Sequence, residues 1–301
     1  MNIRSFIREK KIYCGDDYLE VDIFNYTKSE AENARKGERS KKTIESSPRQ
    51  INLNDINSRR RFIQIVETNF GDNDLHLTLT YNKDNLPNTI EDAERELKNF
   101  LRRVSYKRDK EGLPPLKYIS IPACAYKKDG VTPARIHHHV ILNGGLERDA
   151  LEDLWRKRKA RKQPKGEKIG YANADRLQPD GENGLSALCE YLSKQSGGKK
   201  RWSSSQNLDK PEKEVNDQDK PIRETTSRFS ASANLKRPWS RTNDYKFNRK
   251  EVEKIAKDPP GSAYWERRYP GYGIIGGDYG FEAVYSDSRG WALYLKLRRV
   301  K

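Results

Sequence analysis

Residues 135–143 read Arg-Ile-His-His-His-Val-Ile-Leu-Asn and contain three of the four histidines of this 301-residue chain. Successive side chains of a β-strand point to opposite faces, so His137 and His139 are predicted to share one face, about 6.6–7 Å apart at the backbone. Two imidazoles so placed can bind one metal ion, each at roughly 2.0–2.1 Å. The alternative is a surface strand that happens to be rich in histidine. The apolar residues fall on the opposite face, as packing on a core requires: Ile136, Val140 and Leu142.

The charge of the chain favours a polyanionic partner. Sixty Lys and Arg against 44 Asp and Glu leave a net charge of +16 and a pI near 9.6, which favours a salt-sensitive encounter with nucleic acid. An anionic membrane could also attract the chain, but no apolar run approaches the ~20 residues needed to span a bilayer. The start of the chain shows no signal-peptide pattern, and three widely spaced cysteines form no disulfide framework. We therefore expect a cytoplasmic protein.

Strands interleaved with helices predict an α+β fold with a central, mainly antiparallel sheet and flanking helices. Pro122 interrupts one strand, which argues for an edge position or a bulge. Thr89 is a candidate helix cap. The predicted elements are a hairpin over 11–24, a helix over 53–66, a strand over 75–81, a helix after Thr89, a strand over 117–126, the His strand, a helix over 184–195 and a closing hairpin over 281–297.

The chain is expected to divide into four segments. These are an N-terminal hairpin with a charged segment (1–50), a nuclease-sized core (51–200), a polar Ser-rich loop (201–245), and a C-terminal helix with a closing hairpin (246–301), the last assigned to the same domain as the core.

One internal duplication lies in the polar loop, where the sequence of residues 201–211 recurs in residues 228–238. It is either an insertion with one copy docked or a chance echo, because a single recurrence is too little for a solenoid.

A basic tract follows the His strand. Ala150, Leu151, Leu154 and Trp155 are predicted to begin an amphipathic helix that runs into the tract over 156–168. The tract is either the solvated end of that helix or part of a surface that contacts phosphates, and the sequence leaves both open.

The helix over 184–195 places a tyrosine where it can do chemistry. Tyr191 falls about 110° from the centre of the apolar face, so its hydroxyl can reach outward into a groove, with Lys194 beside it. A phenol attacks phosphate poorly unless a cation stabilises the developing charge. A metal held by His137 and His139 could do this, while Lys194 could supply a second positive charge or a proton. The alternative is an amphipathic tyrosine at the boundary of the core.

Three motifs occur in a telling order: Leu75-His-Leu-Thr-Leu-Thr-Tyr81, His137-His138-His139-Val-Ile-Leu, and Tyr191-Leu-Ser-Lys194. Together they resemble the motifs of HUH-type rolling-circle replication initiators. Gly170-Tyr-Ala-Asn-Ala-Asp-Arg176 and Tyr264-Trp-Glu-Arg-Arg-Tyr-Pro-Gly-Tyr272 are similar to stretches in the replication-associated proteins of bacterial plasmids, integrative elements and phages. The resemblance extends over nearly the whole chain.

This resemblance implies a nuclease domain with a central antiparallel, ferredoxin- or RRM-like sheet and the His pair on a middle strand. It implies that His137 and His139 bind a metal, with His138 where a hydrophobic residue is usual. Tyr191, assisted by Lys194, would then cut one DNA strand, keep the 5′ end as a phosphotyrosine and free a 3′ hydroxyl. Such enzymes use Mg²⁺ or Mn²⁺, and the imidazole pair favours Mn²⁺ or another transition ion because Mg²⁺ prefers oxygen ligands.

One position departs from the family pattern. Relatives commonly carry a glutamate as third ligand on the strand before the His pair, and Ala123 stands there. Either Glu190, His76 or a water completes the metal shell, or metal affinity is weakened and nicking impaired. A packed or solvated role for His76 is the other interpretation of that residue. Ala187 and Gln195 lie one turn from Tyr191, so a single-tyrosine enzyme is implied.

The expected partner is single-stranded or hairpin origin DNA in a bacterial cytoplasm. The chain lacks a Gly-x-x-x-x-Gly-Lys-Ser/Thr motif, so strand separation is expected from a host helicase or supercoiling, and extension from a host polymerase. The alternatives are a conjugative relaxase or single-tyrosine transposase, and a non-catalytic DNA-binding relative. The last would need paired aromatics on adjacent central strands for base stacking, and the His strand has none.

Overall fold

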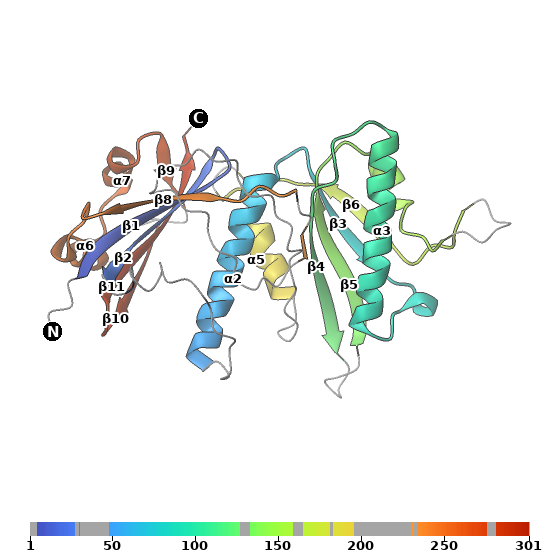
Figure 1. The fold of residues 1–301 in the computed structure, drawn as a ribbon, viewed down its shortest axis with the longest axis horizontal. Helices are drawn as coiled ribbons and strands as arrows, with labels where there is room; N and C mark the ends of the chain where they lie inside the picture. The colour runs from blue at the N-terminus through green and yellow to red at the C-terminus, as the bar shows by residue number, and fades with distance from the viewer. Residues whose placement is uncertain are drawn as a thin grey trace.

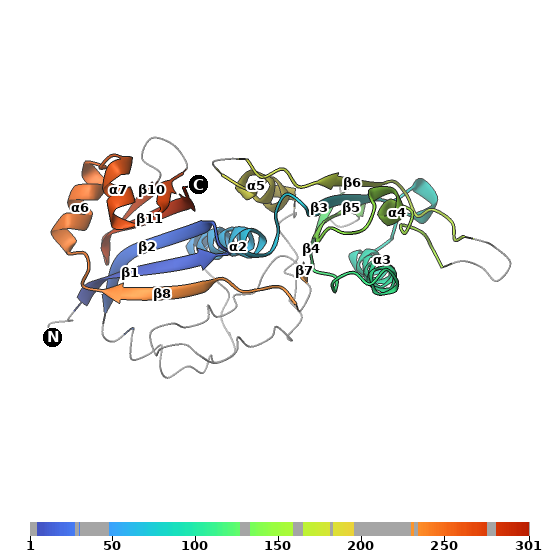
Figure 2. The same ribbon diagram turned by 90° about the horizontal axis from the view of Figure 1, so that it is seen from above.

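Two antiparallel β-sheets with two helices between them form the molecule (Figures 1 and 2). The structure is a computed structural model that describes residues 5–27, 30, 48–126, 133–158, 165–180, 183–195, 230–231, 234–275 and 281–300. The first copy of the predicted duplication and the polar segment after it lie outside these residues. The sheet that carries the histidines is called the His sheet below, and the one built from both ends of the chain is called the terminal sheet.

The His sheet has the strand order β6-β3-β5-β4-β7, and all neighbours are antiparallel. Its middle strand is β5 (Pro133–Leu142). This confirms the predicted α+β fold, with the His-x-His pair on a middle strand of an antiparallel sheet. The other strands are β3 (Leu75–Thr80), β4 (Tyr118–Tyr126), β6 (Ala172–Arg176) and β7 (Ser230–Ala231).

The terminal sheet joins the two predicted hairpins, which lie at opposite ends of the chain. β1 (Ser5–Cys14) and β2 (Tyr18–Thr27) turn at Gly15, and β10 (Phe281–Ser286) and β11 (Gly290–Arg299) form the closing hairpin. β2 pairs with β11, which gives the order β10-β11-β2-β1-β8, with β9 also paired to β11. The sequence indicated both hairpins but not their union. The remaining strands are β8 (Trp239–Asp244) and β9 (Tyr272–Ile274).

The helices cover the sheets in layers. α3 packs on one face of the His sheet and α5 on the other, α2 lies between the sheets, and α6 and α7 cover the terminal sheet (Figure 2). Thr89 caps α3 by accepting a hydrogen bond from the Asp92 amide, as predicted. None of the described helices combines the length and apolar character needed to cross a membrane. Their bounds are α2 (Pro48–Asn69), α3 (Ile90–Lys110), α4 (Arg148–Glu152), α5 (Ser186–Gln195), α6 (Arg249–Lys257) and α7 (Ser262–Arg268), with a 3-10 turn η1 at Lys83–Asn85.

A core shared by both sheets lies around α2 and α5. It gathers Ile12 and Tyr18 of the terminal sheet, Phe62 of α2, Ile141 of the His sheet and Leu192 of α5. Apolar burial contributes about 1.5–3 kcal/mol for each such side chain, so the two sheets are held together by a common core rather than by a tether. Buried Glu20 of β2 adds a polar anchor to α2, because Arg60 and Gln64 donate hydrogen bonds to its carboxylate at 2.8 and 2.6 Å.

The structure corrects the predicted helix over residues 150–168. α4 ends at Glu152, and Trp155 turns inward, where its indole N–H donates to the Thr80 carbonyl at 2.7 Å. The chain beyond it forms a hairpin, with a β-bridge between Arg156 and Lys168. The apolar residues that suggested a continuing helix are buried by this tertiary contact instead. The basic tract is therefore not a helix end.

The edge position predicted for Pro122 is confirmed. β7 pairs with Ile119 and Ser120, and at Pro122 the far side of β4 has no strand partner among the described residues. A proline, which has no N–H to donate to a neighbour, is tolerated at such an edge.

The N-terminus of α5 is held by a pair of charged residues from outside the His sheet. Glu67 of α2 accepts a hydrogen bond from the Leu185 amide at 2.8 Å and an ion pair from Arg298 of β11 at 3.0 Å. Burial raises the pKa of Glu67, against the opposing pull of Arg298. Gly184, just before α5, has φ +59°, and a Cβ there would overlap the Arg298 guanidinium and approach the Glu67 carboxylate. Glycine is thus required twice at this position.

We predict that Gly184→Ala lowers the free energy of unfolding by at least about 2 kcal/mol, from the positive φ together with the collision. Urea denaturation would measure it. Gly112→Ala is the matched control, since Gly112 has φ +66° with open space where the Cβ would lie. The control should lose only the backbone part, about 1 kcal/mol. Equal losses in both variants would contradict a tight contact between α5 and the Glu67–Arg298 pair.

Candidate active site

The register of the His sheet arranges its polar side chains in rows. Residues directly opposite in antiparallel strands share a face, so His137 and His139 lie on the face that α5 covers in part. The rows across β6, β3, β5 and β4 are Thr80-His137-Ala123, then Asn173-Thr78-His139-Ile121, then Asp175-His76-Ile141-Ile119.

Three imidazoles meet at the centre of these rows. The ring centroids of His137 and His139 lie 5.1 Å apart, and those of His76 and His139 lie 5.2 Å apart. The Nε2 atom of His76 is 3.1 Å from Nδ1 of His139, and the Thr78 hydroxyl is 3.4 Å from the same Nδ1. His76 is therefore packed against the predicted ligand His139, one of the alternatives that the sequence left open for it.

Burial keeps these imidazoles neutral. Desolvation lowers the pKa of His139 to about 3, with His76 and His137 adding smaller effects of the same sign. Desolvation also lowers the pKa of His76, opposed by the Asp175 carboxylate. A neutral imidazole has one nitrogen with a free lone pair, which is the form that binds metals. The Nε2 atom of His139 is buried and has no hydrogen-bond partner among the described residues.

The neighbouring His138 has a different environment. It is fully buried on the α3 face, where its Nε2 lies 2.8 Å from the Tyr81 hydroxyl and its ring meets Trp155 edge to face. Burial lowers its pKa to about 3. The Tyr81 hydroxyl also donates to the Ala93 carbonyl at 3.3 Å. His138 is thus a packing residue of the core beneath α3.

Tyr191 of α5 lies beside the histidines. Leu185, Cys189 and Leu192 bury the apolar face of α5 against the His sheet, and Tyr191 at the margin of that face remains 52% exposed. Its ring centroid lies 6.1 Å from that of His139, with the rings edge to face. The structure therefore brings three of the predicted site residues together: His137, His139 and Tyr191. Lys194 belongs to α5, one turn away, and its side chain lies outside the described residues.

The side chains around the His pair leave the shell of a metal incomplete. Ala123 is paired with His137 and is buried, so no carboxylate projects from that position. In the part of the chain that the structure describes, no three His, Cys, Asp or Glu side chains are arranged to hold one ion. Two neutral imidazoles and an unpartnered Nε2 still fit a transition ion whose remaining ligands are water or phosphate oxygens.

The geometry of this site agrees with one of the comparisons with known proteins. Residues 74–196 match the family model of the replication-associated protein ORF2. The match begins before β3, ends after α5 and so contains all three predicted motifs, which confirms the resemblance to replication-associated proteins over this segment. No curated protein and no solved structure matched the chain. A replication-associated segment implies a role in DNA replication and binding to DNA, in keeping with the charge of +16.

Sequence reasoning missed the residues that hold α5 from outside this segment. Glu67 and Arg298 are 231 positions apart, and neither belongs to a recognisable motif. Gly184 was the available signal, since a glycine directly before an apolar helical pattern often marks a required positive φ.

We predict that His138→Leu leaves the free energy of unfolding within about 1 kcal/mol of the wild-type value. The leucine fills an apolar environment, Tyr81 keeps its bond to Ala93, and the Nδ1 atom of His138, which is buried with no partner among the described residues, is removed. Urea denaturation would measure this. A loss above about 2 kcal/mol would show that the His138–Tyr81 bond is a main support of the His sheet.

Proposed function

We propose that this protein is a site-specific endonuclease and strand transferase that nicks one DNA strand and initiates rolling-circle replication of a plasmid, phage or integrative element. The observation that carries the proposal is the position of Tyr191, an exposed phenol whose ring lies 6.1 Å from a buried, neutral histidine of a His-x-His pair. The match to replication-associated proteins over residues 74–196 supports the same conclusion.

The reaction exchanges one phosphodiester for another. The Tyr191 oxygen attacks the scissile phosphorus, the bond from phosphorus to the 3′ oxygen breaks, and the phenol proton is lost as the 3′ oxygen gains one. The products are a 5′-phosphotyrosine and a free 3′ hydroxyl, which a host polymerase can extend. Since one ester replaces another, the same groups can run the reverse step and rejoin the strand. Lys194 is proposed to supply positive charge or a proton to the leaving oxygen.

His137 and His139 are the residues that would hold a divalent ion, of which Mn²⁺ suits imidazole ligands better than Mg²⁺. Such an ion would polarise the scissile phosphate and offset its developing charge. For Nε2 of His139 to carry a lone pair, its Nδ1 must carry the proton. His76 Nε2, at 3.1 Å, is placed to accept that proton in a hydrogen bond, which makes His76 a positioning residue for His139.

A second candidate function follows from the same site. Ala123 and the absence of a three-residue metal group among the described side chains favour a protein that binds DNA but nicks it poorly. The two functions share a fold and a charge, and they differ in whether a covalent adduct forms.

We predict that the wild-type protein, given Mn²⁺ and a 3′-labelled pool of single-stranded oligonucleotides of randomised sequence, forms a labelled adduct that survives denaturing electrophoresis. Tyr191→Phe should abolish the adduct, because it removes the attacking oxygen, while DNA affinity stays within a few fold. Tyr106→Phe, at another exposed tyrosine, is the matched control and should form the adduct normally. An undiminished adduct with Tyr191→Phe would place the nucleophile elsewhere. Binding without any adduct in the wild type would favour the second candidate function.

We further predict that His76→Leu weakens Mn²⁺ binding roughly 10- to 100-fold, the usual effect of losing the residue that orients a metal ligand. His76→Gln, whose amide oxygen can accept the same proton, should retain most of the affinity. Titration calorimetry with Mn²⁺ alone would measure both variants, with His138→Leu as the control on the opposite face of the sheet. Unchanged Mn²⁺ affinity in His76→Leu would contradict the positioning role.

A further inference from the structure

Part of the His face is left uncovered by α5. The apolar side chains of α5 pack over β4 and β5, at Ile119, Ile121 and Ile141. Across β3 and β6 the side chains of the same face, such as Thr78 and Asn173, stay partly exposed. The sheet therefore offers an open strip that begins at the histidines and ends at β6.

Tyr171 stands at the end of this strip, directly before β6. Its ring is 68% exposed, yet its backbone is fixed: the Thr80 amide donates to its carbonyl at 2.8 Å, and its own amide donates to the Thr80 hydroxyl at 3.2 Å. At Gly170 a Cβ would collide with the Thr80 carbonyl, so only glycine permits this close approach. The result is a rigidly mounted aromatic ring that contributes little to the core.

The ring belongs to the same face as the histidines. Ala172 is buried in the core beneath α3, so the preceding residue points to the other side of the sheet. Thr80 is paired with His137. Tyr171 therefore lies two strand spacings from His137, about 10 Å along the row. That separation corresponds to a few nucleotides of an extended strand.

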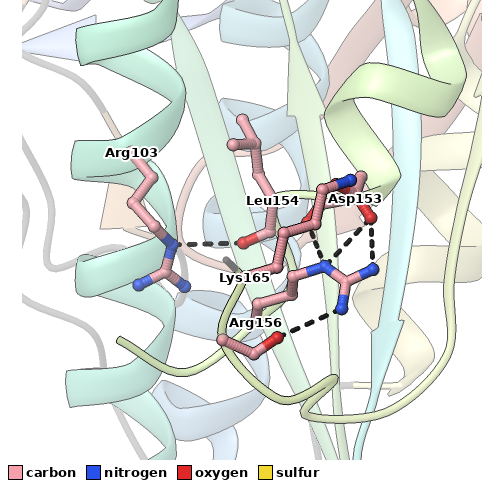
Figure 3. A network of polar contacts seen from close by, with 6 residues as sticks. Arg103, Asp153, Leu154, Arg156 and Lys165 are labelled. Atoms are coloured by element: carbon pink, nitrogen blue, oxygen red, sulfur yellow. Dashed lines mark hydrogen bonds and ion pairs between the residues drawn. The ribbon is translucent and has the colours of Figure 1, made fainter. Parts of the chain in front are cut away.

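A basic hairpin, residues 153–168, borders the strip at the same end of the sheet. Asp153 binds Arg156 and Lys165, the Lys157 amide donates to the Glu167 carbonyl at 2.8 Å, and Arg103 of α3 donates to the Leu154 carbonyl (Figure 3). These contacts set the two arms of the hairpin against α3.

The anchored hairpin carries a surplus of positive charge. Residues 156–168 hold eight Lys and Arg against one carboxylate, Glu167. Lys157, Arg158 and Lys168 are exposed, whereas Arg156 is engaged by Asp153. The Asn82 side chain donates to the Lys168 carbonyl at 3.4 Å, which ties this arm to the turn after β3.

We propose that Tyr171 and the basic hairpin form the groove that holds single-stranded DNA next to the scissile phosphate, with one base stacked on Tyr171 and phosphates along Lys157 and Lys168. A fixed aromatic beside a line of cations is the pattern by which proteins grip single strands without reading sequence. Duplex DNA fits this pattern poorly, because its bases are already stacked on one another. The proposal rests on the nicking function proposed above, and it assigns the basic tract to phosphate contact.

The stacking part is tested by the affinity of the full-length protein for a fluorescein-labelled oligothymidine, measured by anisotropy. Tyr171→Ala should weaken binding roughly 5- to 150-fold. Tyr171→Phe keeps the ring and should bind as the wild type does. Tyr106→Ala is the control, an equally exposed tyrosine (62%) on α3, across the sheet from the strip. Wild-type affinity in Tyr171→Ala, or an equal loss in Tyr106→Ala, would overturn the stacking role.

The phosphate part is tested by repeating the titration over a range of salt concentrations. Lys157→Gln combined with Lys168→Gln should reduce the slope of log affinity against log salt by about 1.4, or about 0.7 for each lost phosphate contact. The charge-matched control combines Lys98→Gln with Lys110→Gln, two exposed lysines of α3, and should leave the slope unchanged. An unchanged slope in the hairpin variant would overturn this part.

These binding measurements need no cleavage, so their outcome is separable from that of the nicking experiment. An adduct on Tyr191 together with wild-type binding by Tyr171→Ala would remove the groove and leave the nuclease. Weakened binding by Tyr171→Ala with no adduct in the wild type would keep the groove as a single-strand site and remove the nuclease.

Discussion

The packing of α5 on the His sheet is the contact on which the candidate site depends. Burial of Cys189 and Leu192 against Ile121 and Ile141 brings Tyr191 to within 6.1 Å of His139, ring centre to ring centre. Apolar contact has no preferred direction, so by itself it would let the helix slide or rotate. The directional part comes from the polar end of the helix, where Glu67 accepts the Leu185 amide. Both kinds of interaction are needed to hold a phenol at one distance from an imidazole.

Strand β5 shows how alternation gives neighbouring histidines opposite roles. His138 is buried beneath α3 and bonds to Tyr81, whereas His139, on the other face, keeps a buried Nε2 without a partner among the described residues. An unsatisfied buried nitrogen costs about 1–3 kcal/mol. The net charge of +16 supplies attraction for DNA at long range, but these short-range imidazoles stay uncharged. The site thus combines a charged approach with a neutral centre, which is the form needed by a metal ligand.

Local patterns were sufficient for much of the fold and of the site. Alternation predicted β3 and β5, the Thr89 cap predicted the start of α3, and the apolar face of residues 184–195 predicted α5 with Tyr191 at its margin. Long-range pairing was not predictable, because β1 finds β8 more than 230 residues away and the hydrophobic pattern of each strand fits several partners. The helix expected after Ala150 failed for a similar reason: burial of Trp155 against Thr80 overrides the local helical pattern. The sequence could locate Ala123 but not say what takes the place of a carboxylate there.

The terminal sheet belongs to the site more closely than its distance in the sequence suggests. Glu20 of β2 anchors α2 through Arg60 and Gln64, α2 supplies Glu67 to the start of α5, and β11 supplies Arg298 to Glu67. The family match spans residues 74–196 and so omits every residue of this clamp. It also omits Phe62, Ile63 and Val66, which form the α2 side of the core around α5. A segment limited to the match would leave the buried face of Leu192 in water and the Leu185 amide without its acceptor. The part of the chain that carries the chemistry is therefore held in position by parts that do not.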